Sequence, residues 1–252
     1  MTLPADRPRP LRPTHAGAVH ERGVDAALHR GIGELAARHG VSEFMVMHAA
    51  FAVLIARLGA TDDITIGIPL GGRGRPELDD LVGMFANTVV LRSAIDRAEN
   101  VGDLLARVRD IDLDAFAHAS IPFEQLVEEL RPVRTTARNP LFDVALFFQN
   151  LTPPELVLPD LTIEPLDPPS HPAQFDLQLT VTGAGESGGI DAHNAESAGL
   201  VLNWLYATDL FDEATVAEFA DRLVAILAAM VADDSTVVGE LPLLSTTDRG
   251  EV

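Results

Sequence analysis

Residues 82–92 read VGMFANTVVLR, and their run of apolar and β-branched side chains predicts a buried strand over residues 84–92. Two polar side chains, Asn87 and Thr88, lie inside this run. Because buried polar groups need hydrogen-bond partners, this pair predicts a strand with fixed neighbours. The stretch ITIGIPL at residues 64–70 predicts a second buried strand. Together the two stretches place a β-sheet in the first half of the chain.

Helices and further strands follow from the spacing of apolar residues. Leu28, Ile32 and Leu35 recur at helical spacing, and the helix that they predict ends near Gly40. Further helices are predicted over 43–58 with Ser42 as N-cap, over 101–117 and 123–130, and after Asp212 as N-cap. Further strands are predicted over 141–149, 161–166, 175–182 and 200–207, with an exposed connection at 183–199. This order predicts an α+β fold, a mixed β-sheet covered by helices on one side.

Charge and composition exclude several classes of protein. The 252 residues carry a formal net charge of −20, and all 18 basic residues are arginine. Residues 1–139 hold 16 arginines against 19 acidic residues, whereas residues 140–252 hold 2 against 19. This acidic charge balance disfavours nucleic acid as a partner, because binding phosphates needs a basic surface. With no cysteine, no membrane-length apolar run and no secretory signal, we expect a cytoplasmic protein without disulfides or membrane contact.

Sequence patterns for hydrolytic and metal chemistry are weak. Residues 185–189, GESGG, fit the G-x-S-x-G pattern and His193 lies nearby, but the glycines that follow predict a turn and not the helix that a nucleophile elbow needs. The eight histidines stand at 15, 20, 29, 39, 48, 118, 171 and 193, none with metal-ligand spacing, so we expect no metal. His118 is expected to end a helix and bond to backbone. His39 and His48 are expected to be partly buried or to face solvent.

Three segments carry a family resemblance: residues 82–92, residues 118–130 (HASIPFEQLVEEL) and residues 134–141 (RTTARNPL). In this order they resemble the last three motifs of nonribosomal peptide synthetase condensation domains. The similarity extends to LPADRPRP (3–10), TDDITIGIPLGGRGRPEL (61–78), QFDLQL (174–179), YATDLF (206–211) and ELPLLS (240–245). Ala86, Ala119, Ser120, Thr135 and Ala137 depart from the family's usual Val, Gln, Asp, Asp and Ser.

The resemblance implies a chloramphenicol-acetyltransferase-like half-domain. The family's catalytic motif, HHxxxDG, is absent from the sequence, so we expect the acceptor-side, C-terminal half of a condensation domain that is inactive alone. Its function would be to contribute to amide bond formation between aminoacyl or peptidyl thioesters on carrier proteins. Residues 1–22 would be a lead-in, 23–234 the subdomain, and 235–252 a linker resembling the condensation-to-adenylation junction.

The residues that match the family motifs divide into two sets. Framework roles are expected for Phe85, Thr88, Arg92, His118, Pro122, Phe123, Glu124, Arg138, Asn139 and Pro140. The resemblance places the candidates for lining the substrate channel at Gly71, Gly72, Arg73, Asn87, Gln174 and Asp176. No catalytic residue is expected in this chain.

The resemblance also sets the expected partners. No cofactor would bind directly, because the substrates arrive on the phosphopantetheine arms of carrier proteins. Other partners would be the N-terminal condensation half or another synthetase domain, and an exposed apolar face allows a homodimer. The alternative is a non-catalytic interaction module that recruits carrier proteins or tailoring enzymes. A self-assembling acyltransferase, in which one chain supplies the base to the next, is disfavoured because the histidine pair is missing.

Overall fold

The computed structural model describes residues 3–71, 76–78, 80–133, 135–149, 171–183 and 198–242. Its strands are β1 (Ala16–Asp25), β2 (Asp63–Gly71), β3 (Ala86–Ala94), β4 (Val144–Gln149), β5 (His171–Pro172), β6 (Leu177–Gly183) and β7 (Ala198–Ala207). Its α-helices are α1 (Ala26–His39), α2 (Glu43–Gly59), α3 (Val101–Ala117), α4 (Phe123–Leu130) and α6 (Glu213–Ala232), with short 3₁₀ turns at Pro76–Leu78 and Val238–Glu240.

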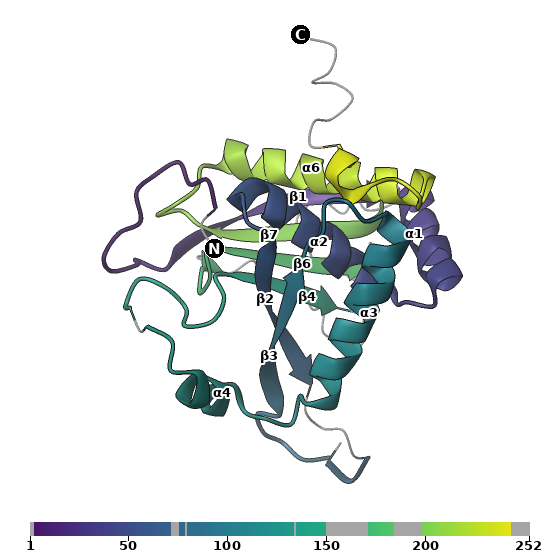
Figure 1. The fold of residues 1–252 in the computed structure, drawn as a ribbon. Coiled ribbons are helices and arrows are strands. Elements are labelled where there is room, and N and C mark those ends of the chain that lie inside the picture. The colour runs from purple at the N-terminus through teal and green to yellow at the C-terminus, as the bar shows by residue number, and fades with distance from the viewer. Residues whose placement is uncertain are drawn as a thin grey trace, which may run out of the picture.

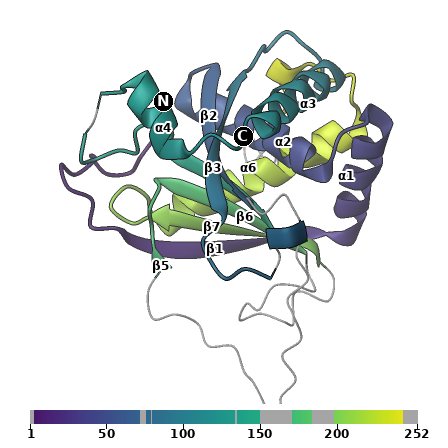
Figure 2. The ribbon, with the colours of Figure 1, turned by 90° about the horizontal axis from the view of Figure 1, so that it is seen from below.

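The strands form one mixed sheet in the order β3-β2-β4-β6-β7-β1-β5. The pairs β2–β4 and β4–β6 are parallel, and the other neighbouring strands are antiparallel. Helices α1, α2, α3 and α6 pack on one face of the sheet, while α4 lies beside the edge strand β3 (Figures 1 and 2). The predicted α+β fold with a helix-covered mixed sheet is therefore confirmed.

Helix α2 lies at the centre of the core. Every residue from 45 to 56 is buried, because α2 packs against β2 and against helices α1, α3 and α6. A helix that is apolar on all sides belongs inside a protein. Within the described ranges, no single helix is long and apolar enough to cross a membrane; only α1 and α2 taken together meet that test, and they are bent by 103°.

The predicted helices are present. Ser42 caps α2 by accepting the Met45 N–H at 3.2 Å, and Gly40 ends α1 in the left-handed conformation that glycine tolerates. The strands expected over 84–92, 141–149, 175–182 and 200–207 are also present, with shifted ends. The expected strand at 161–166 and almost all of the connection at 183–199 lie outside the described residues.

The lead-in expected over residues 1–22 contains a strand that the sequence pattern did not indicate. Strand β1 pairs with β7 from Gly17 to Asp25 and with β5 at its first residues. Its sequence, AGAVHERGVD, has polar residues at its centre and few β-branched ones, so propensity gives no signal for a strand. The long antiparallel pairing with β7 imposes the extended conformation.

Asp212 stands at the N-cap of α6, but the expectation that its side chain caps this helix is wrong. Its carboxylate pairs with Arg7, and it makes no cap hydrogen bond. Asp6, which is far from α6 in the sequence, takes this place. Its Oδ2 accepts a hydrogen bond from the Asp212 N–H and its Oδ1 accepts one from the Thr215 hydroxyl, both at 2.8 Å. The reason is long-range contact between the N-terminal segment and the start of α6.

Replacing Asp6 with alanine is expected to lower the free energy of unfolding by about 1 kcal/mol at neutral pH, as for loss of a helix cap. The Asp212 N–H and the Thr215 hydroxyl hold the pKa of Asp6 below its ordinary 3.8. A carboxyl group whose pKa is lower in the folded than in the unfolded protein stabilises the fold at pH values above its pKa in the unfolded protein. This contribution is lost as the pH falls through its pKa in the folded protein. Urea titrations should therefore separate the two proteins at neutral pH and bring them together in acid. A difference of the same size at both pH values would contradict this role.

Candidate functional site

The first two motif segments are joined by one side chain, Asn87 of β3. Its Nδ2 donates to the carbonyl oxygens of Ala119 at 2.9 Å and Ile121 at 2.7 Å. Its Oδ1 accepts the Phe123 N–H at 3.2 Å. That N–H belongs to the first turn of α4, whose N-cap, Pro122, offers no side-chain cap. Asn87 therefore fixes both the loop after α3 and the start of α4.

Phe142, which directly follows the third motif segment, contacts the second segment through its aromatic ring. Phe142 lies between Phe123 and Phe175, with ring centroids 5.8 and 5.1 Å apart. Arg138 donates to Asp143 Oδ2 at 2.5 Å, which anchors the loop before β4. The three motifs thus form one connected framework that carries α4.

Removing the Asn87 amide should loosen this framework. Asn87→Ala is expected to lower the free energy of unfolding by about 2 kcal/mol, because three hydrogen bonds are lost and their backbone partners are left partly enclosed. Amide hydrogen exchange in α4 should rise with it. Thr88→Val is the matched control, since the Thr88 hydroxyl has no partner in the part of the chain that the structure describes; its expected change is within about 0.5 kcal/mol. Equal effects of the two substitutions would contradict the role of Asn87.

A pocket opens at the amino ends of β4 and β6. It is lined by the N-terminal segment, by the loop around Arg138, by the residues before β6 and by the end of β7, including Arg9, His15, Asp143, Gln174, Asp176 and Asp209. Arg9 binds both carboxylate oxygens of Asp176, with Nη1 2.8 Å from Oδ1. Burial raises the pKa of the Asp143 carboxyl, and the neighbouring Asp176 raises it further, while Arg138 opposes the shift.

The six candidates for the substrate channel fall into two separate groups. Gly71 and Asn87 lie together at the end of the β2–β3 ribbon, where Leu70 faces Asn87. Gln174 and Asp176 precede β6. Strands β2, β4 and β6 all run in the same direction. Gln174 and Asp176 therefore lie at the opposite end of these strands from Gly71. Gly72 and Arg73 are outside the described residues, and a channel role for the six stays a prediction.

A framework role for the remaining motif residues stays a prediction, and the structure gives their positions. His118 follows α3, and its Nδ1 lies 2.8 Å from the Asp114 carbonyl, which confirms the expected bond of a helix-end histidine to backbone. Arg92 pairs with Asp63 on the neighbouring strand at 2.7 Å. The other positions are Phe85 before β3, Thr88 within it, Glu124 in the first turn of α4, and Asn139 and Pro140 before β4.

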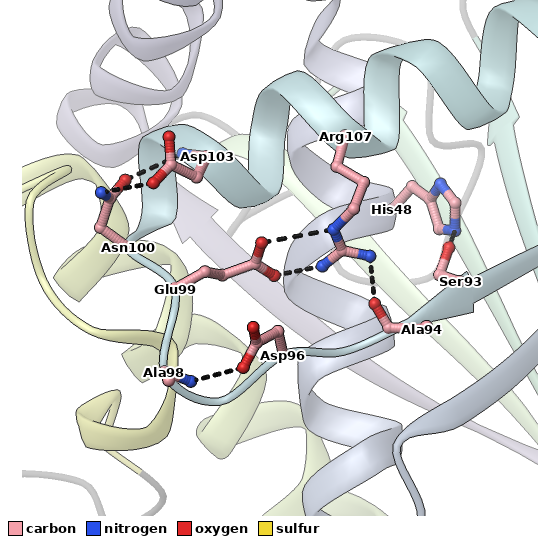
Figure 3. A network of polar contacts seen from close by, with 9 residues as sticks. All are labelled: His48, Ser93, Ala94, Asp96, Ala98, Glu99, Asn100, Asp103 and Arg107. Carbon is pink, nitrogen blue, oxygen red and sulfur yellow. Dashed lines mark hydrogen bonds and ion pairs between the residues drawn. The ribbon is translucent and has the colours of Figure 1, made fainter.

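A buried polar group, which sequence spacing did not reveal, lies between α2, α3 and β3. His48 Nδ1 is 2.9 Å from Asp112 Oδ1, and His48 Nε2 is 3.4 Å from the Ser93 hydroxyl. Figure 3 shows His48 beside Ser93, with Arg107 of α3 holding Glu99 and the Ala94 carbonyl close by. The expectation that His48 is partly buried or faces solvent is wrong, since the side chains of His48 and Asp112 and the whole of Ser93 are fully buried.

The order serine, histidine, aspartate resembles an acyl-transfer triad, but this group cannot reach a substrate. The contact between His48 and Asp112 also lacks the alignment of a hydrogen bond. We therefore assign it to the core. Among the described residues, no three histidine or carboxylate side chains are grouped as metal ligands.

Comparison with known proteins agrees with the motifs. The family model described as "Condensation domain" matches residues 1–252. The chain is 43% identical over 252 residues to CymA of Salinispora arenicola (strain CNS-205), described as a probable nonribosomal peptide synthetase, and 38% identical to a dimodular nonribosomal peptide synthase of Bacillus subtilis (strain 168). Both alignments cover all of this chain, but only 3% and 10% of those proteins.

A solved structure has the same arrangement of elements. The X-domain from teicoplanin biosynthesis, in complex with OxyB, superposes with a TM-score of 0.83 at 27% identity over 97% of this chain and 52% of that chain. The mixed sheet with its helical layer is thus of the chloramphenicol-acetyltransferase-like type found in condensation domains. The chain belongs to the condensation domain family of nonribosomal peptide synthetases.

Proposed function

We propose that this chain is the acceptor-side, C-terminal half of a condensation domain and contributes to amide bond formation between carrier-bound thioesters. The observation that carries the proposal is how much of each chain superposes: almost all of this chain matches only 52% of the X-domain chain. In addition, the sequence of this chain contains the last three motifs of the family but not HHxxxDG. The other half would carry HHxxxDG.

Exposed apolar side chains support a missing partner. Six of the large hydrophobic side chains that are most exposed lie in two segments joined by Asn87: Leu81, Val82, Met84, Ile121, Leu130 and Val133. Val82, Met84 and Val133 are at least 90% exposed. Large apolar side chains exposed close together are typical of surfaces that another protein covers. A second copy of this chain is the rival occupant, which the mass of the protein in solution would reveal.

In the proposed reaction this half positions the reactants and does not move the proton. Holding an amine and a thioester in line accounts for a large part of the rate in such two-substrate reactions. None of the eight histidines stands in an HHxxxDG pattern, and residues 206–212, YATDLFD, contain no imidazole. The general base would therefore come from the other half.

The test is an amide-forming assay with two loaded carrier proteins, in which this chain alone is expected to give no product above the uncatalysed background. Turnover by the isolated chain would refute the proposal.

A second candidate is a non-catalytic interaction module. The structurally similar X-domain is found in complex with OxyB from teicoplanin biosynthesis, which favours a recruiting role for folds of this kind. Binding of this chain to carrier proteins or tailoring enzymes, measured by calorimetry, would support this candidate if no condensation activity can be reconstituted. Absence of any such binding would exclude it.

A further inference from the structure

The N-terminal segment, residues 3–15, crosses the ends of β6 and β7 as an extended strap. Asp6 and Arg7 bind the Leu210 carbonyl through their N–H groups, at 2.9 and 3.2 Å. Thr14 donates its N–H and its hydroxyl to Asp209, at 2.7 and 2.9 Å. The strap thereby forms one wall of the pocket at the amino ends of β4 and β6.

Arg9 is the anchor at the centre of this strap. Its guanidinium binds Asp176 through two nitrogens and donates to the Ala137 carbonyl at 3.0 Å. The side chains of Arg9 and Asp176 are only 22% and 11% exposed, whereas those of Arg7 and Asp212 are 46% and 56% exposed. Exposed pairs contribute little, and a planar bidentate pair that is mostly shielded from water contributes more.

Most of the strap is held by hydrogen bonds and ion pairs, from its backbone and its side chains, and not by apolar packing. Leu3 is buried in the core, but Leu11 is 88% exposed and the segment contains four prolines. It forms neither helix nor strand, and His15 has a left-handed backbone with φ of 59°, which is costly for a residue other than glycine. Segments with few buried apolar contacts open locally at low free energy.

We propose that the strap is a latch that can open and close. In the closed state, Arg9 binds the Asp176 carboxylate. When the strap lifts, Asp176 and Asp143 face the open pocket beside Gln174. This proposal deepens the proposed function and rests on it in one respect: Gln174 and Asp176 are the candidates for lining the channel at this end of the strands.

Hydrogen exchange of two backbone N–H groups near Arg9 would show whether the strap opens. The Ala173 N–H donates to the His15 carbonyl and the Asp176 N–H donates to the Asp143 carbonyl, both at 2.9 Å. Both bonds lie beside the Arg9 contact, so their protection from hydrogen exchange depends on the closed strap. Amides in α2 lie in the core and report only global unfolding.

The experiment is hydrogen–deuterium exchange by mass spectrometry on the full chain, comparing Arg9→Ala with Arg12→Ala. Arg12 lies in the same strap, is exposed, and has no partner within the described ranges, so it is the matched control. Arg9→Ala is expected to raise exchange about tenfold in peptides covering Ala173 and Asp176, while α2 stays protected. Millimolar methylguanidinium, which can fill the vacated site beside Asp176, should reverse the increase in Arg9→Ala and leave Arg12→Ala unchanged.

Two results would overturn the latch. Equal exchange in Arg9→Ala and Arg12→Ala would show that Arg9 does not hold the strap. An increase that includes α2 to the same extent would show that the strap is part of the cooperative core. Neither readout requires condensation activity, so failure of the latch and failure of the proposed function are distinguished.

Discussion

Asp112→Ala is expected to lower the free energy of unfolding by about 1–3 kcal/mol, because it leaves the fully buried imidazole of His48 without its polar neighbour. Asp110→Ala, on the exposed side of the same helix, is the control and should change it by no more than about 0.5 kcal/mol. Urea denaturation followed by circular dichroism measures both.

The pair should be dispensable when both members are replaced. Two apolar side chains of similar volume remove the desolvation cost of both polar groups, so His48→Leu combined with Asp112→Leu should recover most of the loss. If the double variant were less stable than His48→Leu alone and than Asp112→Leu alone, this explanation would be contradicted. An Asp112→Ala protein as stable as Asp110→Ala would show that the pair is not enclosed.

Gly67→Ala is expected to cost about 1–3 kcal/mol, as for overpacking of a closed core. A Cβ at this position would lie 2.1 Å from Phe142 Cε2. Phe142 cannot move aside freely, because it is buried between Phe123 and Phe175. Gly71→Ala in the same strand is the control, since its Cβ meets no atom within 4 Å among the described residues.

A smaller side chain at position 142 should relieve the clash at Gly67. In the background Phe142→Leu, the additional cost of Gly67→Ala is expected to fall below its cost in the natural protein. Thermal unfolding of the four proteins in this cycle measures the difference. Costs that are the same in both backgrounds would place the strain elsewhere than at the ring of Phe142.

Local patterns predicted the elements whose signal is carried by neighbouring residues. Helix α2 has apolar residues on all sides and a serine before its first turn, so its position and its cap were both predictable. Strand β1 has no such signal, because its conformation comes from pairing with β7, which lies far along the chain. The cap of α6 was mistaken for the same reason: Asp6 is more than two hundred residues away from Asp212.

The candidate site was predictable only as separate motifs. Hydrogen bonding of Asn87 was expected from a strand predicted to be buried. The strand is instead the edge strand β3, where Asn87 is half-buried, and the partners of Asn87 around Ile121 and Phe123 were not predicted. No sequence spacing indicates that Arg9 meets Asp176 or that His48 meets Asp112. The contact of His48 with Asp112 depends on the packing of α2 against α3, and that of Arg9 with Asp176 depends on the path of the N-terminal segment; neither is encoded by the spacing of residues in the sequence.

If this chain is one half of a condensation domain, mixing it with the other half should restore amide bond formation. The assay combines this chain, a separately expressed half bearing HHxxxDG, and two loaded carrier proteins, and it measures the amide product by mass spectrometry. Product is expected only in the complete mixture, with a loss of about 100-fold or more when the second histidine of HHxxxDG is replaced by alanine. Product from the HHxxxDG half without this chain, or from this chain without that half, would contradict it.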